Sequence, residues 1–260
     1  MFGIFAYYLA SPFMLIICLL PRTAMCGAIE LMQIAKIGTA AVTFAYFLRK
    51  TGKPKNTSLV IFSTCYALMA YMVVQLMDPM WLDGLIYLPL ICWGVHRLVD
   101  EGKILPFIFI PLALMFIAHF YIGYMVGFFT FCYFVYYCLS REGRILPKHI
   151  FRRIVQFGAA TVTAIMTASI VLIPVYNSLK LGKLEFSTPD FSLATQFDFL
   201  TFITKLFPMS YDTVYPEGLP MVFCGSAVLL LVPLFFMNSR ITVKEKVSKG
   251  LLLLVLFVSM

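Results

Sequence analysis

The chain has 260 residues, of which 62% are hydrophobic and 12% are charged. Soluble domains average roughly 45–50% apolar and about 25% charged residues, so a soluble fold could not bury this much apolar surface. The apolar runs are also far longer than the roughly ten-residue alternating segments of an outer-membrane barrel. The sequence therefore predicts an all-α fold, a polytopic transmembrane helix bundle forming one domain over residues 1–260.

The net charge of +8 would suggest nucleic acid in a soluble protein. Here the cations lie in short connections between apolar runs, where they indicate topology and contact anionic headgroups. The sequence contains no Gly-rich phosphate loop, C-x-x-C motif or Cys/His pair at metal spacing. We therefore predict membrane lipids as partners, and no nucleic acid, metal or other cofactor.

Apolar runs give the expected spans in chain order. Residues 2–20 are broken by Ser11-Pro12, and either cross the membrane or form a bent helix in the outer interface. One helix over residues 104–139 would be about 54 Å long, too long for a hydrocarbon core of roughly 30 Å. We expect a helical hairpin there, with its turn near residues 119–123. The other expected spans are 24–48, 58–74, 82–95, 154–173 and 220–237, and a further span begins at residue 251.

Most Lys and Arg residues fall in one set of connections, which by the positive-inside rule is cytoplasmic. The opposite connections, with residues 78–83 and 174–219, are then predicted to face outward. Within this second segment, residues 190–207 place apolar side chains at helical spacing. This pattern predicts an amphipathic helix lying on the outer face of the membrane. The basic connections are residues 49–55, 97–103, 141–153 and 240–249.

Candidate site residues lie at the predicted outer face. Asp78 and Asp83 form a pair of carboxylates around Trp81 that suits acid–base chemistry. Both also suit the start of a helix, as a cap and as an early-turn acid, and Trp81 suits a membrane interface.

Further candidates come from the hairpin turn and from one intramembrane charge. His119 could contact a phosphate or transfer a proton, and Tyr121 and Tyr124 could stack on a sugar or belong to an aromatic belt. Lys36 lies inside an apolar run, where it either snorkels or binds an anionic headgroup.

Several stretches in order along the chain resemble the YfhO family of bacterial membrane proteins, which are relatives of GT-C-type glycosyltransferases. The resemblance covers essentially all 260 residues. The matching stretches are Phe2-Gly-Ile-Phe-Ala-Tyr-Tyr-Leu-Ala-Ser-Pro12, Lys36-Ile-Gly38, Tyr66-Ala-Leu-Met-Ala-Tyr71, Met80-Trp-Leu-Asp83, Phe120-Tyr-Ile-Gly-Tyr124, Gly218-Leu-Pro220 and Phe223-Cys-Gly225.

The resemblance implies a GT-C-like enzyme of the bacterial cytoplasmic membrane. It would move a sugar from a polyprenyl-phosphate carrier to a cell-envelope polymer such as lipoteichoic acid. Asp78 or Asp83 would then hold the acceptor or a metal ion. Lys36 and His119 would contact the phosphate, and Trp81, Tyr121 and Tyr124 the sugar. Family members are longer, with an acidic outer loop before Phe2, so on this resemblance the chain is expected to be an incomplete enzyme.

Two other functions remain open at this stage. A transporter or flippase of lipid-linked precursors would show inverted repeats and broken helices near the membrane midplane, and no repeat is evident in the sequence. An inactive truncated remnant would insert correctly without turnover.

Overall fold

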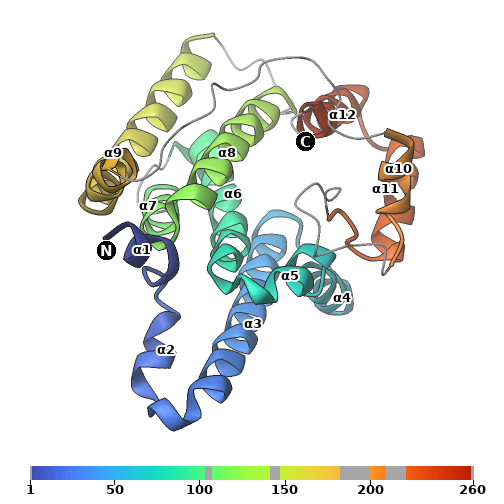
Figure 1. The fold of residues 1–260 in the computed structure, drawn as a ribbon. Helices are drawn as coiled ribbons and strands as arrows, with labels where there is room; N and C mark the ends of the chain where they lie inside the picture. Colours follow the sequence, from blue (N-terminus) through green and yellow to red (C-terminus); the bar gives the residue numbers. More distant parts are fainter. Residues whose placement is uncertain (1, 103–106, 141–146, 182–198, 209–220, 259–260) are drawn as a thin grey trace.

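The computed structural model describes residues 2–102, 107–140, 147–181, 199–208 and 221–258. All regular structure in these residues is helical (Figure 1). The α-helices are α1 (Phe2–Tyr8), α2 (Met14–Leu19), α3 (Met25–Thr51), α4 (Asn56–Ala67), α5 (Ala70–Val74), α6 (Asp83–Glu101), α7 (Phe109–Ala118), α8 (Phe120–Ser140), α9 (Pro147–Leu181), α10 (Phe199–Thr204), α11 (Ser226–Met237) and α12 (Val243–Val258), and the 3₁₀ turns are η1 (Arg22–Ala24), η2 (Gln75–Met77) and η3 (Pro79–Leu82).

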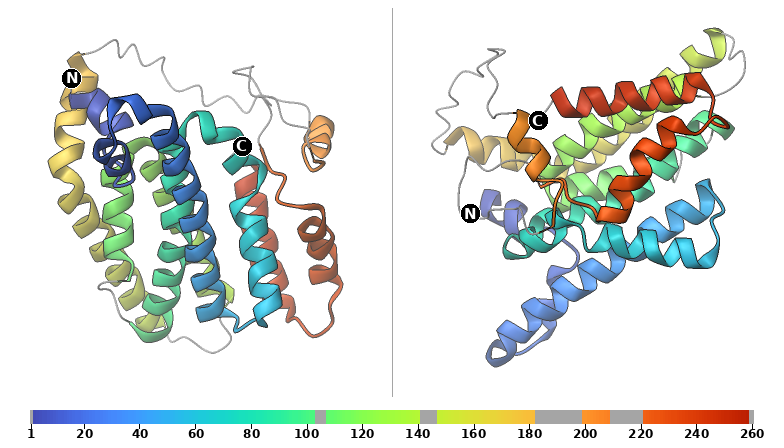
Figure 2. Two further views of the ribbon diagram at one scale, coloured as in Figure 1. Left: turned by 90° about the horizontal axis from the view of Figure 1, so that it is seen from below. Right: turned by 90° about the vertical axis from the view of Figure 1, so that its right-hand side faces the viewer.

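Four helical segments within the described residues are long and apolar enough to cross a membrane. The α4–α5 pair adds a fifth crossing if its two bent helices are counted as one span. These helices run side by side in the left view of Figure 2, which confirms the predicted all-α polytopic bundle. The four segments are Arg22–Thr51, Pro79–Glu101, Phe120–Ser140 and Ile150–Ser178.

Helix α6 forms the centre of the bundle, packed against α3, α7 and α8. In its most apolar stretch 67% of the residues are buried, against 17–28% in the other three spans. Its Ile91 and Val95 are fully buried, each in a different hydrophobic cluster. The helices at the periphery of the bundle expose many large apolar side chains, as expected for surfaces that face lipid.

Gly94 allows α6 to approach the chain leading into α7. A Cβ atom added there would lie 2.5 Å from the Phe107 carbonyl oxygen and 2.8 Å from Ile108 Cα. Both are backbone atoms, which cannot rotate away as a side chain can.

We expect Gly94→Ala to destabilise the protein by about 1–3 kcal/mol, the usual cost of overpacking a core. Gly38→Ala in α3 is the matched control, because an added Cβ there meets no atom within 4 Å and alanine favours a helix. Thermal unfolding of the purified proteins in detergent measures both. Equal unfolding temperatures would contradict the close approach.

The predicted hairpin over residues 104–139 is confirmed by α7 and α8. The chain reverses at His119, whose backbone is extended (φ −159°, ψ 105°). Gly123 lies against the backbone of Phe116, where an added Cβ would be 3.2 Å from the Phe116 Cα atom. Pro111 lies inside α7, and Pro106 is outside the described residues.

The predicted span 58–74 is divided into α4 and α5, which are bent by 45° at Leu68 and Met69. At the break the Ala70 N–H donates to the Phe223 carbonyl, with an N···O distance of 2.9 Å. Phe223 belongs to the segment before α11, which is not helical over residues 221–225. A partner distant in sequence therefore satisfies a backbone group that the break frees.

Residues 2–20 form two short helices, α1 and α2, and neither is long enough to span a membrane. Helix α2 packs on α3, and α1 packs on α7, α8 and α9. Both lie at the same end of the bundle as η3, opposite the α3–α4 connection (Figure 2). This arrangement favours the interfacial alternative over a crossing. We call the end with α1, α2 and η3 the outer end, following the predicted orientation.

Three predicted boundaries differ in the structure. Helix α9 continues through Pro174 to Leu181, so the segment predicted as an outer loop from residue 174 begins as helix. Helix α11 starts at Ser226, later than the predicted 220, and α12 starts at Val243, before 251. Of the amphipathic helix predicted over 190–207, α10 is helical, and residues 190–198 lie outside the described residues.

Candidate functional site

Lys36 and Asp83 form an ion pair inside the bundle. The Lys36 Nζ atom lies 2.8 Å from Asp83 Oδ2, and both side chains are 0% exposed. Lys36 belongs to the buried stripe of α3 that includes Met32 and Ala40, and Asp83 is the first residue of α6. Because α3 packs directly on α6, the stripe directs the ammonium group at the start of α6.

Neighbouring groups complete the hydrogen bonding of this pair. The Lys36 ammonium also donates to the Pro79 carbonyl at 2.8 Å, and the Ser11 hydroxyl donates to Asp83 Oδ1 at 3.0 Å. The Gln33 amide donates to the Leu76 carbonyl at 2.7 Å. The buried pair thus joins α3, the η2–η3 turns and the α1–α2 link at the outer end.

The two predicted acids have different surroundings. Both oxygens of Asp83 accept hydrogen bonds from the protein, and its side chain is fully buried, so it cannot take a proton from an acceptor molecule in this conformation. Asp78 is half-buried in the outer turn between η2 and η3. Its carboxylate accepts no hydrogen bond from the residues that the structure describes, and it does not cap η3. Asp78 is therefore the accessible acid.

Trp81, Tyr7 and His119 form a connected group beside the ion pair. The Trp81 indole Nε1–H donates to the Tyr7 hydroxyl at 3.3 Å. The Tyr7 ring meets the His119 ring edge-on, with 4.7 Å between centroids. Tyr7 is a site residue that sequence reasoning missed, although it lies in one of the stretches that resemble the family.

His119 is fully buried and incompletely hydrogen-bonded. Its Nδ1 atom accepts the Ile122 N–H at 3.1 Å, and its Nε2 atom has no partner among the described residues. Burial, with a smaller contribution from the Lys36 charge, lowers the pKa of His119 to about 4. The neutral ring then carries its proton on Nε2, because Nδ1 is an acceptor. His119 thus supplies one unused N–H donor.

The two predicted tyrosines lie on the surface of α8. Tyr121 is 45% exposed and Tyr124 is 73% exposed, so neither belongs to the buried group around His119. Tyr121 lies in the neighbourhood of Tyr71, which is also near Asp78. Tyr121 therefore lies on the Asp78 side of the outer end, and the exposure of Tyr124 is typical of an interface aromatic.

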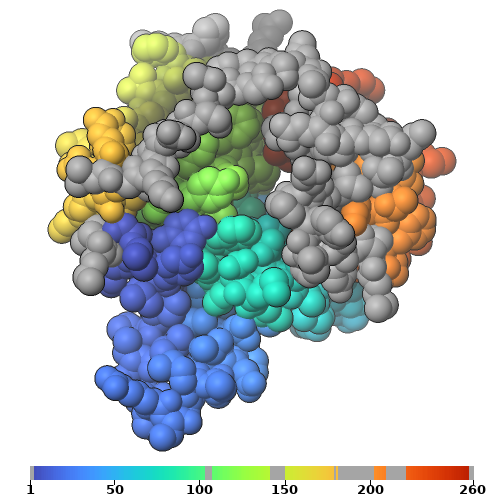
Figure 3. Space-filling model, viewed as in Figure 1, coloured from blue at the N-terminus to red at the C-terminus, as the bar shows by residue number. Residues whose placement is uncertain are grey.

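A cavity of about 320 Å³ opens between α1, α8 and α9, next to this group. Its lining combines aromatic rings with hydroxyl groups, a mixture that suits sugar rings and lipid headgroups. Figure 3 shows α1 and the η2–η3 region together at this surface, beside α8. The residues that line the cavity are Gly3, Ile4, Tyr7, Tyr8, Phe120, Val175 and Ser178.

Across the described ranges, no group of three His, Cys, Asp or Glu side chains is placed to hold a metal ion. What the outer end offers is one accessible carboxylate, one unpaired N–H donor and a cavity with hydroxyl groups. These groups could bind a polar ligand delivered from the membrane.

Fold and site together define a polytopic membrane protein with a polar cluster at one end of its helices. The family model described as bacterial membrane protein YfhO matches residues 1–260, so the chain belongs to the YfhO family. Neither the curated proteins nor the solved structures include a significant match.

Proposed function

We propose that this protein is a glycosyltransferase-like enzyme of the bacterial cell membrane. It transfers a sugar from a polyprenyl-phosphate carrier to a cell-envelope polymer, such as lipoteichoic acid, on the outer face. The observation that carries this proposal is the His119 group: a buried, unpaired N–H donor beside Tyr7 and Trp81, at the predicted outer end of the helices. The His119 side chain is 0% exposed, so a carrier confined to the bilayer reaches this group only after the packing of Tyr7 of α1 against the His119 ring opens.

The chemistry requires a base, a stabilised leaving group and a held sugar. Asp78 accepts the proton of the acceptor hydroxyl, whose oxygen then bonds to the anomeric carbon. The bond from that carbon to the phosphate oxygen breaks, and polyprenyl phosphate leaves with the electron pair. His119 donates its Nε2–H to the phosphate, and Trp81, Tyr121 and Tyr124 contact the sugar or its acceptor.

The buried ion pair changes the roles first assigned to Lys36 and Asp83. Two of the three Lys36 donors are used by Asp83 and Pro79, so Lys36 holds the outer end in shape instead of binding the headgroup directly. Asp83 fixes Lys36 and Ser11. In this proposal Lys36 and Asp83 are positioning residues, and Asp78 is the catalytic base.

The test is transfer of labelled sugar from a polyprenyl-phosphate donor to polymer in membrane vesicles that contain the protein. We expect His119→Phe to lower transfer about 10- to 100-fold, because a hydrogen bond to a charged group contributes about 1.5–3 kcal/mol. Phenylalanine keeps an aromatic ring against Tyr7 and Phe120, while it removes the Nε2–H donor and the Nδ1 acceptor of the Ile122 N–H. His119→Gln, which keeps an N–H donor, should retain more activity.

Equal sugar transfer in vesicles with and without the protein would show that the protein does not catalyse this reaction. If wild type and His119→Phe transfer sugar equally at matched protein levels, the protein is still an enzyme, but His119 takes no part in the reaction. Correct insertion with no transfer from any polyprenyl-phosphate sugar supplied would favour the inactive remnant.

The broken α4–α5 span is the observation that favours a transporter or flippase, since discontinuous helices line many transport sites. Against this, the Phe223 carbonyl already satisfies the Ala70 N–H at the break, so that group is not open to a ligand. The two functions differ in one measurement. A flippase would move labelled lipid-linked sugar between leaflets without forming polymer.

A further inference from the structure

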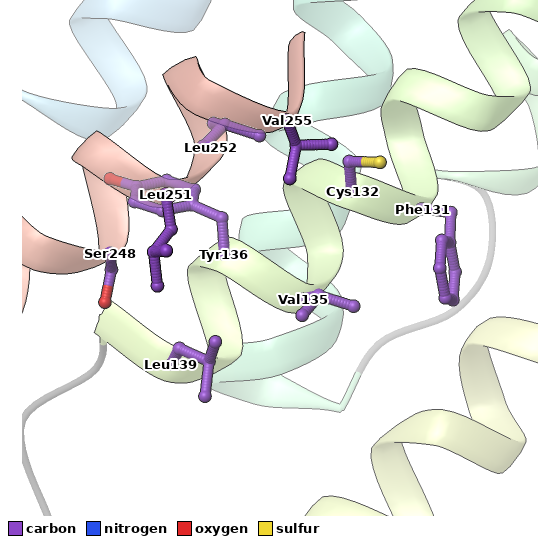
Figure 4. A pocket seen from close by; sticks show the side chains of 9 residues that line it. All are labelled: Phe131, Cys132, Val135, Tyr136, Leu139, Ser248, Leu251, Leu252 and Val255. Atoms are coloured by element: carbon purple, nitrogen blue, oxygen red, sulfur yellow. The ribbon is translucent and has the colours of Figure 1, made fainter. Parts of the chain in front are cut away.

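A groove runs between α8 and α12, away from the outer cluster. Figure 4 shows side chains from both helices around it, and its volume is about 160 Å³. Its walls include Val135, Tyr136 and Leu139 of α8 and Ser248, Leu251 and Val255 of α12. The wall residues Leu139 and Leu251 are each 51% exposed, so the groove opens onto the outside of the helix bundle, where lipid would surround it.

One end of this groove is strongly basic. The α11–α12 turn and the first turns of α12 carry four cations, Arg240, Lys244, Lys246 and Lys249, and one carboxylate, Glu245. Glu245 is paired with Lys249 at 2.7 Å, and over residues 240–249 the four cations outnumber this one carboxylate. In the left view of Figure 2 this turn lies at the end of the bundle opposite α1 and α2.

Lys244 links the basic turn to the groove. It is exposed and lies one helical turn before Ser248, whose hydroxyl donates to the Lys244 carbonyl at 2.8 Å. Residues four apart share a helix face, so the Lys244 side chain lies on the face of α12 that lines the groove. Tyr136 contributes an aromatic hydroxyl to the wall, a group typical of the boundary between acyl chains and headgroups.

We propose that this groove is a binding site for an anionic phospholipid. One acyl chain lies between α8 and α12, and the phosphate contacts the cations of the α11–α12 turn, with Lys244 nearest the groove. Charge decides between possible occupants. A second copy of the chain would bring its own net charge of +8 against this turn, whereas an anionic headgroup complements it. The site is independent of the proposed sugar transfer.

The experiment measures lipid binding to the purified protein by native mass spectrometry, with phosphatidylglycerol and phosphatidylcholine of matched chains. We expect at least tenfold preference for phosphatidylglycerol. Each cation near an anionic headgroup contributes about fivefold, so Arg240→Ala with Lys244→Ala should weaken phosphatidylglycerol binding about 25-fold. Lys55→Ala is the matched control, because Lys55 is exposed in the basic α3–α4 connection and should change binding less than twofold.

A second measurement uses the wild-type protein alone, so its outcome does not depend on whether a variant folds. Binding of phosphatidylglycerol to the wild type should weaken as salt rises, because screening reduces contacts between exposed charges. Equal binding of the two lipids, or the same loss in Lys55→Ala as in the double variant, would overturn the proposal. A dimer in solution that Leu251→Trp dissociates would also overturn it, because a second copy would then occupy the groove.

Discussion

Lys36→Met is expected to destabilise the protein by about 3–5 kcal/mol, the largest stability effect that we predict for a single substitution. Methionine matches the length of the lysine stem and removes the charge, which leaves the buried Asp83 carboxylate with the Ser11 hydroxyl as its one side-chain partner among the described residues. A buried charge without its counter-ion costs several kcal/mol, and breaking a buried pair from one side typically costs 3–5 kcal/mol.

The double variant Lys36→Met/Asp83→Leu should recover most of that loss. Replacing both ions with apolar side chains removes the desolvation cost as well as the attraction, and such replacements are often neutral or stabilising. Glu101→Gln is the surface control. It breaks the pair between Glu101 and Arg97, whose side chains are 37% and 28% exposed, and should cost at most about 1 kcal/mol.

Thermal or denaturant unfolding in detergent of the wild type, Lys36→Met, Asp83→Leu, the double variant and Glu101→Gln measures these differences. Additive losses in the two single variants and the double variant would show that Lys36 and Asp83 are not coupled. If Lys36→Met is as stable as the Glu101→Gln control, the Lys36–Asp83 ion pair does not stabilise the outer end of the bundle.

The spans and the hairpin follow from sequence because they depend on local properties. A run of apolar residues must pair its backbone within its own helix in lipid, and a run too long for the bilayer must turn back. The turn at His119 was predictable in this way. The break between α4 and α5 was not, because the group that satisfies it, the Phe223 carbonyl, lies far along the chain.

The sequence allowed the residues of the candidate site to be named, but it did not show which of them lie next to one another in the fold. Lys36 and Asp83 are separated by 47 positions, and nothing in either local pattern indicates that they meet. Their pairing depends on α3 packing against α6, which is a tertiary choice. The same packing separates Asp83 from Asp78, two acids that look equivalent in sequence.

Asp78→Asn is expected to lower sugar transfer by about 10²–10⁴-fold, the usual contribution of general base catalysis. Asparagine keeps the size of the side chain, and Asp78 holds no ion pair or side-chain hydrogen bond among the described residues that the change would break. Insertion and unfolding temperature should therefore stay close to those of the wild type. The measurement is transfer from polyprenyl-phosphate sugar at matched protein levels.

Asp83→Asn is the informative comparison for this last prediction. It removes the charge that neutralises Lys36, so its effect should appear first as lost stability, with transfer falling in proportion to the folded protein that remains. If Asp83→Asn abolishes transfer in a stable protein while Asp78→Asn transfers normally, the base is Asp83. The outer end must then open during the reaction to expose that carboxylate. If both stable variants transfer normally, the base lies outside this pair of acids.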